Sequence, residues 1–325
     1  MPANLPPQYY EVEKTFRQAK SPEEKISILE EMLAIMPKHK GTDHLRAELR
    51  GRIAKLAQLA TKKSGARRAS MAIEKEGAAQ VAVIGLPNAG KSQLVASITS
   101  ASPAVAEYPF TTQTATPGMM VFENIQIQLI DTPPLVPATI EWWLRHMLIR
   151  ADALLIVVDL SDNALVRMED IMARLQEMHI AIGERKGEEP EAILYQKKAL
   201  IIGTKLDLDN ASESYTALKN KYEGQLPVIA VSAKEGTDLE ELKRAIYHML
   251  DIIRVYTKTP GQQPDFDDPI ILERGSTLEH AAAEVHKDFA QKLKYARIWG
   301  SGKHDGVMAK RNHVLRDGDV IELHL

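Results

Sequence analysis

The sequence contains no cysteine among its 325 residues, which excludes disulfide bridges and thiolate metal sites and fits a reducing compartment. It also lacks a long hydrophobic run, because the longest ones, such as residues 153–158, are far too short to cross a bilayer. The first residues show no basic stretch followed by an apolar one, as a signal peptide would. We therefore expect a soluble, cytoplasmic protein.

An excess of charge of either sign is missing too. The 41 Lys and Arg residues nearly balance 44 Asp and Glu residues, and the net charge of -3 gives the whole molecule no attraction for nucleic acid or membrane. Apolar residues make up 44% and charged residues 26%, as in ordinary globular proteins. Any attraction for a polyanion must therefore come from a local surface.

The N-terminal region carries such a local surface. Apolar residues recur at spacings of three and four from residue 8 to about residue 75, which predicts helices, and two helices are the simplest interpretation. Residues 21–24 form a capping box with Pro22 at the first helical position. Between Lys38 and Arg68, ten basic residues face two acidic ones. This segment is either a solvated helix face or a nucleic-acid surface, and composition favours neither.

From residue 80 to about residue 255, short apolar runs alternate with longer helical stretches. Near-continuous apolar strands separated by helices are typical of a parallel sheet that is covered on both faces. We expect a doubly wound, mostly parallel α/β sheet here. The predicted strands are residues 81–84, 125–130, 153–158, 199–202 and 227–231.

The end of the chain reads as a separate small unit. A segment rich in Pro, Gly and acidic residues, 257–268, is typical of a linker. After it we expect a strand at 270–272, a helix capped by Ser276 and Glu279, and strands at 295–299 and 319–323. This order fits a β-grasp, ubiquitin-like module.

A phosphate-binding loop lies at the start of the α/β region. Gly85, Gly90, Lys91 and Ser92 have the spacing Gly-x-x-x-x-Gly-Lys-Ser, after a predicted strand and before a helix. The glycines let backbone N–H groups approach phosphates, Lys91 reaches the β- and γ-phosphates, and the Ser92 hydroxyl is suited to bind Mg²⁺. The sequence therefore predicts a P-loop nucleotide-binding site.

Two later segments favour guanine over adenine. Thr204-Lys205-Leu206-Asp207 follows the fourth predicted strand, and Asp207 could accept two hydrogen bonds from the guanine edge. Adenine lacks those donors and would leave the carboxylate unpaired, so ATP is the disfavoured alternative. Ser232-Ala233-Lys234 follows the fifth strand and supplies a second loop near the base.

Mg²⁺ and the γ-phosphate are expected to contact the segments between these motifs. Asp131 ends the second predicted strand, in the position of a Walker-B carboxylate. Residues 108–118 form a Thr-rich loop, in which Thr112 is our candidate for the metal and the γ-phosphate. A β-turn stretch with incidental hydroxyl groups is the alternative for this loop.

These segments together resemble the five signature segments of the Obg/DRG family of translation-factor-class GTPases. Residues 285–300 and 313–320 are similar to the TGS domain of DRG proteins, and the basic helices before the GTPase domain match the order of that family. The resemblance implies a P-loop GTPase that uses GTP/GDP and Mg²⁺. It also implies contact with RNA, ribosomes or a protein partner through the basic helices and TGS domain. No membrane partner is expected.

The resemblance sets the expected domains and site. The domains are an N-terminal helical region with a basic helix (1–76), an Obg-type GTPase domain (77–256), a linker (257–268) and a TGS domain (269–325). The nucleotide is expected at Pro87, Asn88, Ala89, Gly90, Lys91, Ser92, Gln93, Thr204, Lys205, Asp207, Ser232, Ala233 and Lys234, the metal at Ser92, Thr112 and Asp131, and catalytic roles at Lys91 and Thr112.

This chain departs from the family at two places. DRG proteins usually carry an inserted domain after the Asp-x-x-Gly segment, but only 19 residues separate Asp131 from Ala151 here. The Asp-x-x-Gly segment itself reads Asp-Thr-Pro-Pro, and Pro134 has no backbone N–H to donate to a γ-phosphate. Leu135 follows, an apolar residue that cannot orient water.

Two expectations about turnover result from these departures. We expect slow intrinsic GTP hydrolysis that an ion or a partner accelerates, with K⁺ as a candidate ion because Asn88 stands where related cation-dependent GTPases place a K⁺ ligand. Asn88 could instead simply stabilise the loop. The alternative for the whole protein is a GTP-sensing binding module with little or no turnover.

Aromatic residues in the TGS-like unit allow two interpretations. Tyr295 and Trp299 lie near Lys287, Lys292, Lys294 and Arg297, a mixture suited to RNA phosphates and bases. From the residues alone, inward packing of the two rings on a strand is the better interpretation.

Overall fold

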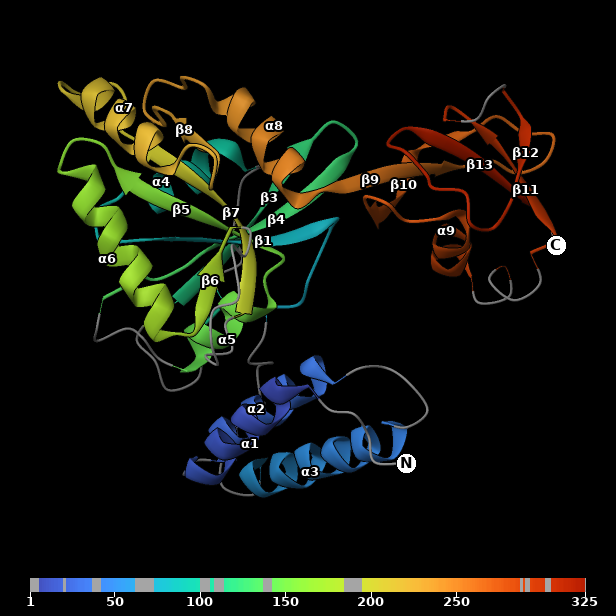
Figure 1. Cartoon of the computed structure of the whole chain (residues 1–325), viewed down its shortest axis with the longest axis horizontal. Helices are drawn as coiled ribbons and strands as arrows, with labels where there is room; N and C mark the ends of the chain where they lie inside the picture. Colours follow the sequence, from blue (N-terminus) through green and yellow to red (C-terminus); the bar gives the residue numbers. More distant parts are fainter. Residues whose placement is uncertain are drawn as a thin grey trace.

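Three parts follow one another along the chain, each with its own set of packed elements (Figure 1). The computed structural model describes residues 6–19, 22–36, 42–61, 73–99, 106–107, 114–136, 142–183, 195–286, 289, 293–301 and 305–324. In this described part, no helix combines the length and the apolar character needed to span a membrane.

The described N-terminal residues form three helices, where the sequence predicted two. They are α1 (Pro7–Gln18), α2 (Pro22–Ile35) and α3 (Asp43–Thr61). α1 is a separate helix because the backbone of Ala19, directly after it, is extended, with ψ of 131°. Pro at the start of α1 and α2 costs no hydrogen bond, since the first N–H groups of a helix have no partner within it. The apolar side chains of the three helices pack together around Tyr9, Leu29 and Leu49.

One basic residue of α3 has a structural task. Arg46 donates from Nη1 to the carbonyl oxygens of Met36 at 2.9 Å and Leu33 at 3.3 Å, at the C-terminal end of α2. The last carbonyls of a helix lack partners within it, so a cation there stabilises the helix end. Arg46 therefore joins α2 to α3 and is not part of a free basic face.

The described strands of the central part form an eight-stranded sheet. The order is β2-β3-β4-β1-β5-β7-β6, and β8 also pairs with β7. The register places β6 against residues 195–197 of β7 and β8 against residues 201–203. The strands are β1 (Ala79–Gly85), β2 (Ala106–Glu107), β3 (Thr114–Phe122), β4 (Ile125–Asp131), β5 (Ala153–Asp159), β6 (Ile180–Ile182), β7 (Tyr195–Thr204) and β8 (Val228–Ala230).

The five strands predicted for this sheet are all present, and β2, β3 and β6 were missed. β3 is the instructive one, because residues 114–118 were expected to belong to a Thr-rich loop. They are instead strand, antiparallel to β4, with Thr116 opposite Asp131. The β-branched threonines suit a pleated strand, and a paired neighbour decides their conformation. The pairs of β3 with β2 and β4 are antiparallel, and the other pairs of this sheet are parallel.

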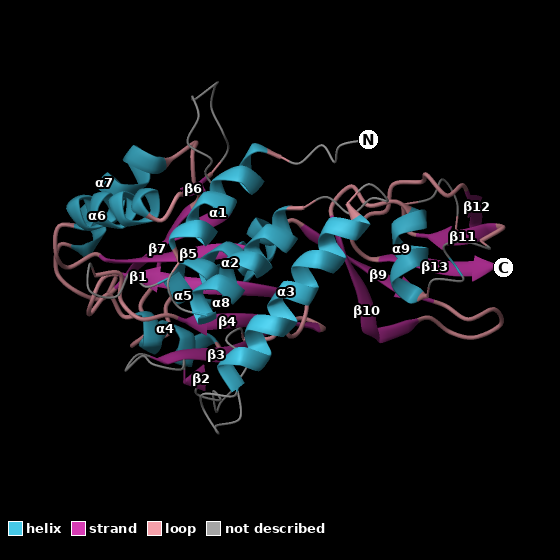
Figure 2. Ribbon diagram, turned by 90° about the horizontal axis from the view of Figure 1, so that it is seen from below, coloured by secondary structure: helices cyan, strands magenta, loops and turns pink. Residues whose placement is uncertain are grey.

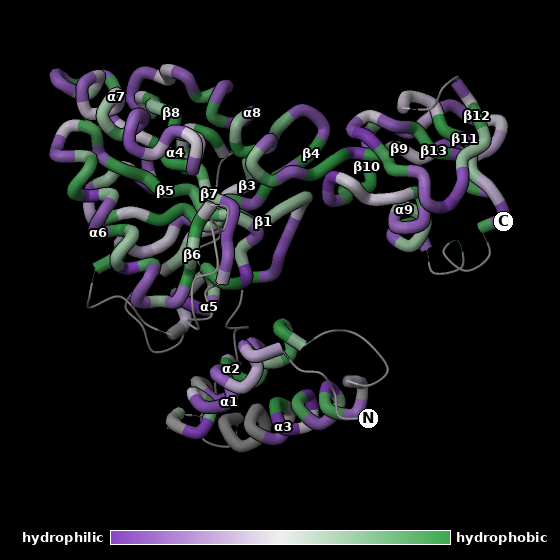
Figure 3. The backbone as a smooth tube through the Cα atoms, viewed as in Figure 1, coloured by the Kyte–Doolittle hydropathy of each residue, from purple (hydrophilic) through white to green (hydrophobic). Residues whose placement is uncertain are grey.

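Helices cover both faces of this sheet, as a doubly wound fold requires. The helices are α4 (Lys91–Ile98), α5 (Trp142–Arg150), α6 (Ala164–Glu177), α7 (Ala211–Tyr222) and α8 (Leu239–Leu250). Side chains of α5, α6 and α7 pack with Ala82 and Ile84 of β1, whereas those of α4 and α8 pack with Val81 and Val83. Successive strand residues point to opposite faces, so one apolar strand serves two cores. Figure 3 shows the resulting hydrophobic strands inside more hydrophilic helices.

The described residues of the C-terminal part form a five-stranded sheet with a helix packed on it (Figure 2). The elements are β9 (Ile252–Thr257), β10 (Asp265–Glu273), α9 (Leu278–Val285), β11 (Tyr295–Trp299), β12 (Val307–Ala309) and β13 (Asp319–His324), with the strand order β10-β9-β13-β11-β12. The parallel pairing of β13 with β9 and the helix packed against the sheet match the β-grasp expectation.

Two local details of this part differ from the expectation. The helix cap is Thr277 with His280 three residues later, rather than Ser276 with Glu279. Thr277 N donates to His280 Nδ1 at 3.2 Å, so an imidazole takes the place of the expected carboxylate. In addition, β9 pairs within the second sheet although its residues lie before the expected boundary at 257, and β10 starts at Asp265 inside the segment expected to be a linker.

The N-terminal helices contact the central part through a buried acid. Glu31 on α2 is 6% exposed. It accepts hydrogen bonds from Arg145 Nη1 on α5, at 3.3 Å, and from the Tyr195 hydroxyl on β7. Arg145 also donates from Nε to the carbonyl of Met178 at 2.8 Å. Burial, followed by the carboxylate of Glu31, raises the pKa of Tyr195, so its hydroxyl remains a donor at physiological pH.

Replacement of Arg145 by Met is expected to lower the free energy of unfolding by about 1 to 3 kcal/mol, because Glu31 would lose its cationic partner while staying buried. Arg17→Met is the matched control, since Arg17 pairs with Glu13 on the exposed surface of α1 and its loss should cost less than about 1 kcal/mol. Urea denaturation followed by circular dichroism compares the two. Equal effects would contradict a structural role for the buried contact.

Candidate nucleotide-binding site

The phosphate loop runs from the end of β1 to the start of α4, as its motif predicts. Gly85 is the last residue of β1, and a Cβ atom there would meet the carbonyl oxygen of Val157 at 2.5 Å. Gly90 is the N-cap of α4 with φ of 85°, in the left-handed region. Both positions therefore require glycine. Asn88 shares a positive φ of 60°, a conformation that Asn tolerates better than most residues.

Lys91 bridges this loop. Its side chain is buried, and Nζ donates to the carbonyls of Gly85 and Leu86, both at 3.3 Å. Burial lowers the pKa of Lys91, while the negative charge of Asp131 acts in the opposite direction. An ammonium group in this position, beside a helix N-terminus, is placed to attract phosphate oxygens.

Asp131 lies next to the loop because β4 pairs in parallel with β1, with Val83 opposite Asp131. Its Oδ1 atom is buried and has no hydrogen-bond partner in the part of the chain that the structure describes. Burial raises the pKa of Asp131, and a hydrogen bond with Ser92 and the charge of Lys91 oppose that rise. A buried carboxylate oxygen without a partner, beside a serine hydroxyl, fits a bound Mg²⁺, which takes oxygen ligands. Thr112, the third expected ligand, lies outside the described residues.

Thr204 ties the guanine-recognition segment to the phosphate loop. It is buried at the end of β7, and its hydroxyl donates to the carbonyl of Ala89 at 2.7 Å. The next residue, Lys205, has a φ of 62° and donates from Nζ to Asp159 Oδ2 at 2.6 Å. These two contacts connect the ends of β5 and β7 with the loop after β1.

Asp159 is a site residue that the sequence analysis missed. Ser161 donates to its Oδ1 from the backbone at 2.9 Å and from the hydroxyl at 2.6 Å. Burial would raise the pKa of Asp159, but the hydrogen bonds from Lys205 and Ser161 outweigh it, so the net pKa is lowered. The available signal was a carboxylate at the end of a buried strand, the same signal that selected Asp131.

Asp207 and Ser232 meet although 25 residues separate them in sequence. Ser232 Oγ donates to Asp207 Oδ1 at 2.6 Å, and this hydrogen bond is the main cause of the lowered pKa of Asp207. The contact forms because β7 and β8 are parallel neighbours, and Leu206 N donates to Val231 O across them at 3.2 Å. Asp207 is thus held ionised and oriented, which recognition of a guanine edge would need.

The Asp-Thr-Pro-Pro segment is held on the side of the phosphate loop. Thr132 donates to the carbonyl of Val83 from both its backbone N–H, at 3.3 Å, and its hydroxyl, at 2.8 Å. Leu135 N donates to Gly85 O at 3.0 Å, while its side chain is fully buried in the core shared with α5. The side chain of Leu135 is therefore part of the protein core.

The structure thus brings most of the expected residues to one edge of the sheet. Ala89 is bonded to Thr204, and Lys91 lies close enough to Asp131 for their charges to interact. The remaining expected residues are Pro87 and Asn88 in the phosphate loop, Ser92 and Gln93 in the first turn of α4, and Ala233 and Lys234 after β8. Ala233 is half-buried and the others are exposed.

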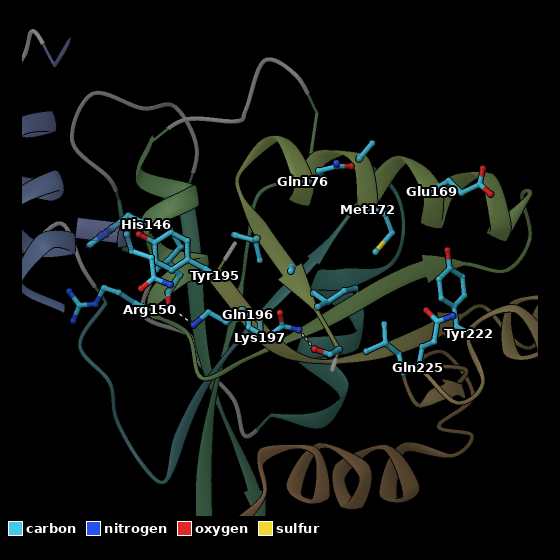
Figure 4. Close-up of a pocket in the computed structure, with 18 of the residues that line it drawn as sticks. His146, Arg150, Glu169, Met172, Gln176, Tyr195, Gln196, Lys197, Tyr222 and Gln225 are labelled. Atoms are coloured by element: carbon cyan, nitrogen blue, oxygen red, sulfur yellow. Dashed lines mark hydrogen bonds between the residues drawn. The ribbon is translucent and has the colours of Figure 1, made fainter. Parts of the chain in front are cut away.

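A cavity of about 1380 Å³ lies elsewhere, between α2 and the β6 edge of the sheet. Figure 4 shows His146, Arg150, Tyr195 and Lys197 together at one end of it. Burial, followed by the charges of Arg150 and Arg145, lowers the pKa of His146 to about 4, so this imidazole is neutral at physiological pH. The expected nucleotide-binding residues do not line this cavity.

Comparisons with known proteins agree with this arrangement. The family described as 50S ribosome-binding GTPase matches residues 80–197, and the TGS domain family matches residues 253–325. An uncharacterized GTP-binding protein of Methanocaldococcus jannaschii is 30% identical, with 93% of this chain and 92% of that protein covered. GTP-binding protein 1 of Schizosaccharomyces pombe is 29% identical (92% and 98% covered), and human developmentally-regulated GTP-binding protein 2 is 26% identical (92% and 98%).

A solved structure supports the fold. The YchF GTPase of Schizosaccharomyces pombe superposes with a TM-score of 0.54 at 13% identity, covering 79% of this chain and 100% of that one. The alignment with the Methanocaldococcus protein spans 363 positions, more than the 325 residues of this chain, so that relative has segments that this chain lacks.

Asp207→Asn is expected to weaken GDP binding by roughly 100-fold, because two hydrogen bonds to a carboxylate would be lost. Binding of xanthosine diphosphate should rise, since its base offers an oxygen to the new amide. Asp209→Asn, two residues away on the exposed surface, is the control and should leave both affinities unchanged. Isothermal titration calorimetry measures all four values, and equal GDP affinities in the two variants would refute the role of Asp207.

Proposed function

Because the chain belongs to the Obg/DRG family of GTPases with a C-terminal TGS domain, we propose that it is a slow, Mg²⁺-dependent GTPase switch that acts on ribosomes or RNA. The observation that carries the proposal is the meeting of Lys91, Asp131 and Ser92 at the phosphate loop, next to the pair Asp207 and Ser232.

Each group has a defined task in this proposal. The phosphates lie against the backbone N–H groups at the start of α4, and Lys91 offsets the charge that develops between the β- and γ-phosphates. Ser92 and Asp131 hold the Mg²⁺, with Thr112 as the expected third ligand. An Mg²⁺ ion held there would neutralise phosphate charge. Asp207 and Ser232 select guanine, and Lys205 is fixed by Asp159.

Slow turnover follows from the Asp-Thr-Pro-Pro segment. Pro134 offers no N–H to the γ-phosphate, and the N–H of Leu135 is already bonded to Gly85. The side chain of Leu135 is buried, so this segment presents no group that orients water. The same observation favours the second candidate function, a GTP-sensing module with little or no turnover.

Multiple-turnover phosphate release separates the two functions. We expect basal release on the order of 10⁻⁴ to 10⁻² s⁻¹, as for GTPases without an activator, and faster release with ribosomes in K⁺ buffer. Na⁺ in place of K⁺ should slow the reaction if Asn88 binds K⁺, and equal rates would exclude that role. An absence of release under every condition would favour the binding module.

Pro134→Gly is expected to raise the affinity for a non-hydrolysable GTP analogue by about 10-fold, because a restored N–H can donate to the charged γ-phosphate. GDP affinity is the internal control and should not change, since GDP has no γ-phosphate. Titration with both nucleotides gives the ratio of the affinity for the GTP analogue to the affinity for GDP. A gain that is equal for both nucleotides would point to a general change of the loop instead.

A ribosome or RNA surface is best supported on α3. Arg50, Arg52 and Lys55 are exposed there, whereas Arg46 is engaged with carbonyls of α2. The family that matches residues 80–197 is described as ribosome-binding, which supports a ribosome as the partner, although the match does not include α3. The aromatic residues of the TGS sheet support it less, because Tyr295 is stacked on His324 at 4.3 Å between ring centroids and Lys258 Nζ lies 4.3 Å from the Trp299 ring centroid. Lys287 and Lys292 lie outside the described residues.

The triple reversal Arg50→Glu, Arg52→Glu and Lys55→Glu is expected to abolish cosedimentation with ribosomes at moderate salt. For each cation that no longer neutralises a phosphate, the slope of log RNA affinity against log salt should also become shallower by about 0.7 to 0.9. Lys14→Glu with Arg17→Glu on the exposed face of α1 is the control and should sediment as before. Unchanged sedimentation of the triple variant would exclude α3 as this surface.

A further inference from the structure

Arg254 links the turn between β3 and β4 to the C-terminal sheet. Arg254 on β9 has a side chain only 12% exposed, and its Nη1 donates to the Glu123 carboxylate and, at 3.2 Å, to Asn124 Oδ1. Both partners lie in the β3–β4 turn, so a guanidinium of the second sheet binds a loop of the first. We refer to Glu123, Asn124, Arg254 and Asp317 as the inter-sheet joint.

Asp317 holds Arg254 in place from the other side. Arg254 donates to it from Nη2 at 2.7 Å, from Nε at 3.1 Å and from the backbone N at 2.7 Å. The Tyr247 hydroxyl on α8 donates to the same carboxylate at 2.9 Å, and the guanidinium lies 5.2 Å from the Tyr247 ring centroid. The pKa of Asp317 is lowered because these hydrogen bonds outweigh its burial. Burial and Asp317 raise the pKa of Tyr247 to about 12.

Asn124 also binds the second sheet through hydrogen bonds of its own. Its Nδ2 donates to the Tyr256 hydroxyl at 2.8 Å and to the carbonyl of Phe266 at 2.9 Å, so it binds both β9 and β10. Close to it, Phe122 of β3 stacks on Tyr247 with 5.0 Å between ring centroids. The Arg254 guanidinium and the Asn124 amide each form hydrogen bonds at several atoms. Together they fix the orientation of the turn more strictly than a single exposed ion pair would.

The same hairpin leads to the nucleotide-binding site at its other end. β3 and β4 are paired in register over seven residue pairs, from Phe122 with Ile125 at the turn to Thr116 with Asp131. At about 3.3 Å per residue this ladder is roughly 20 Å long. β4 ends at the candidate Mg²⁺ ligand, and β3 begins at Thr114, within the Thr-rich segment 108–118. Figure 1 shows the turn of this hairpin on the side of the first sheet that faces β9 and β10.

We propose that the β3–β4 hairpin transmits the nucleotide state of the Asp131 end to the C-terminal sheet, and that Arg254 is the positioning residue of this link. The inference rests on the proposed function, in which Mg²⁺ and GTP engage Asp131 and the Thr-rich loop. A hydrogen-bonded two-stranded ladder moves as a unit, so a shift at one end changes the contacts at the other. Because coupling is reciprocal, the joint in turn biases the affinity for GTP over GDP.

The absence of cysteine makes the proposal directly measurable. Glu213→Cys on α7 and Glu284→Cys on α9 place two exposed thiols, one in the central part and one in the C-terminal part, in a chain that has no others. Spin labels on both report the distance between the sheets by double electron–electron resonance. We expect this distance to differ between the GDP complex and the complex with Mg²⁺ and a non-hydrolysable GTP analogue.

Arg254→Met is expected to abolish this difference and to change the ratio of the two nucleotide affinities by about 5-fold or more, with binding itself retained. Asn124→Leu should reduce the difference in distance between the two complexes, because the hydrogen bonds of Asn124 to Tyr256 and Phe266 would be lost. Arg274→Met is the matched control, because Arg274 forms an exposed ion pair with Asp251 beside the same sheet without touching the hairpin, and it should keep the difference. Thermal unfolding of each variant confirms that it is folded.

The outcomes separate the inference from the proposed function. If the labelled chain binds neither guanine nucleotide, the proposed function fails and the link fails with it. If both nucleotides bind but the distance is the same, the link alone is overturned. The link is also overturned if Arg254→Met and Arg274→Met respond equally, since the joint would then have no specific part in the coupling.

Discussion

Parallel pairing of β1 with β4 and β5, and of β5 with β7, is the constraint on which the rest of the structure depends. Parallel strands end at the same edge of a sheet, so their register sets Asp131 beside Val83, Val157 beside Gly85 and Thr204 beside Asp159. The loops that follow these strands therefore meet, and a hydroxyl at residue 204 can bind the carbonyl of residue 89. The apolar faces of these strands fill two cores and keep that edge rigid.

The same edge carries groups that are costly to bury. Lys91 is desolvated, which lowers its pKa, and Asp131 is desolvated, which raises its pKa, with one carboxylate oxygen left without a partner among the described residues. Such groups cost stability unless a ligand pairs with them. Asp159 is instead bonded to Ser161 and Lys205, and one carboxylate oxygen of Asp207 is bonded to Ser232. In the proposed function, the half of the candidate site expected to bind the base is therefore prearranged, whereas the half expected to bind metal and phosphate gains partners on binding.

Beyond the central sheet, the three parts of the chain are held by a few buried polar contacts. Glu31 joins α2 to α5 and β7 through Arg145 and Tyr195, and Arg254 joins β9 to the β3–β4 turn and to Asp317. Buried charges of this kind bind only partners of matching geometry, so they set orientation more than they add stability. The inter-sheet joint differs from the Glu31 contact because it lies at the turn of the β3–β4 hairpin, and the other end of this hairpin contains Asp131.

The sequence by itself determined the elements and motifs that depend on neighbouring residues. Apolar runs predicted the five main strands, and the phosphate loop, Asp131, Asp207 and Ser232 were selected as candidates because each follows a predicted strand that local residues specify. Tertiary structure decided what depends on distant partners: β3 became a strand because β4 lies beside it, β9 joined the second sheet because β13 pairs with it, and Asp159 entered the site through Lys205. Arg254 gave no sequence signal, because its four partners come from segments up to 131 residues away, and only folding brings them together.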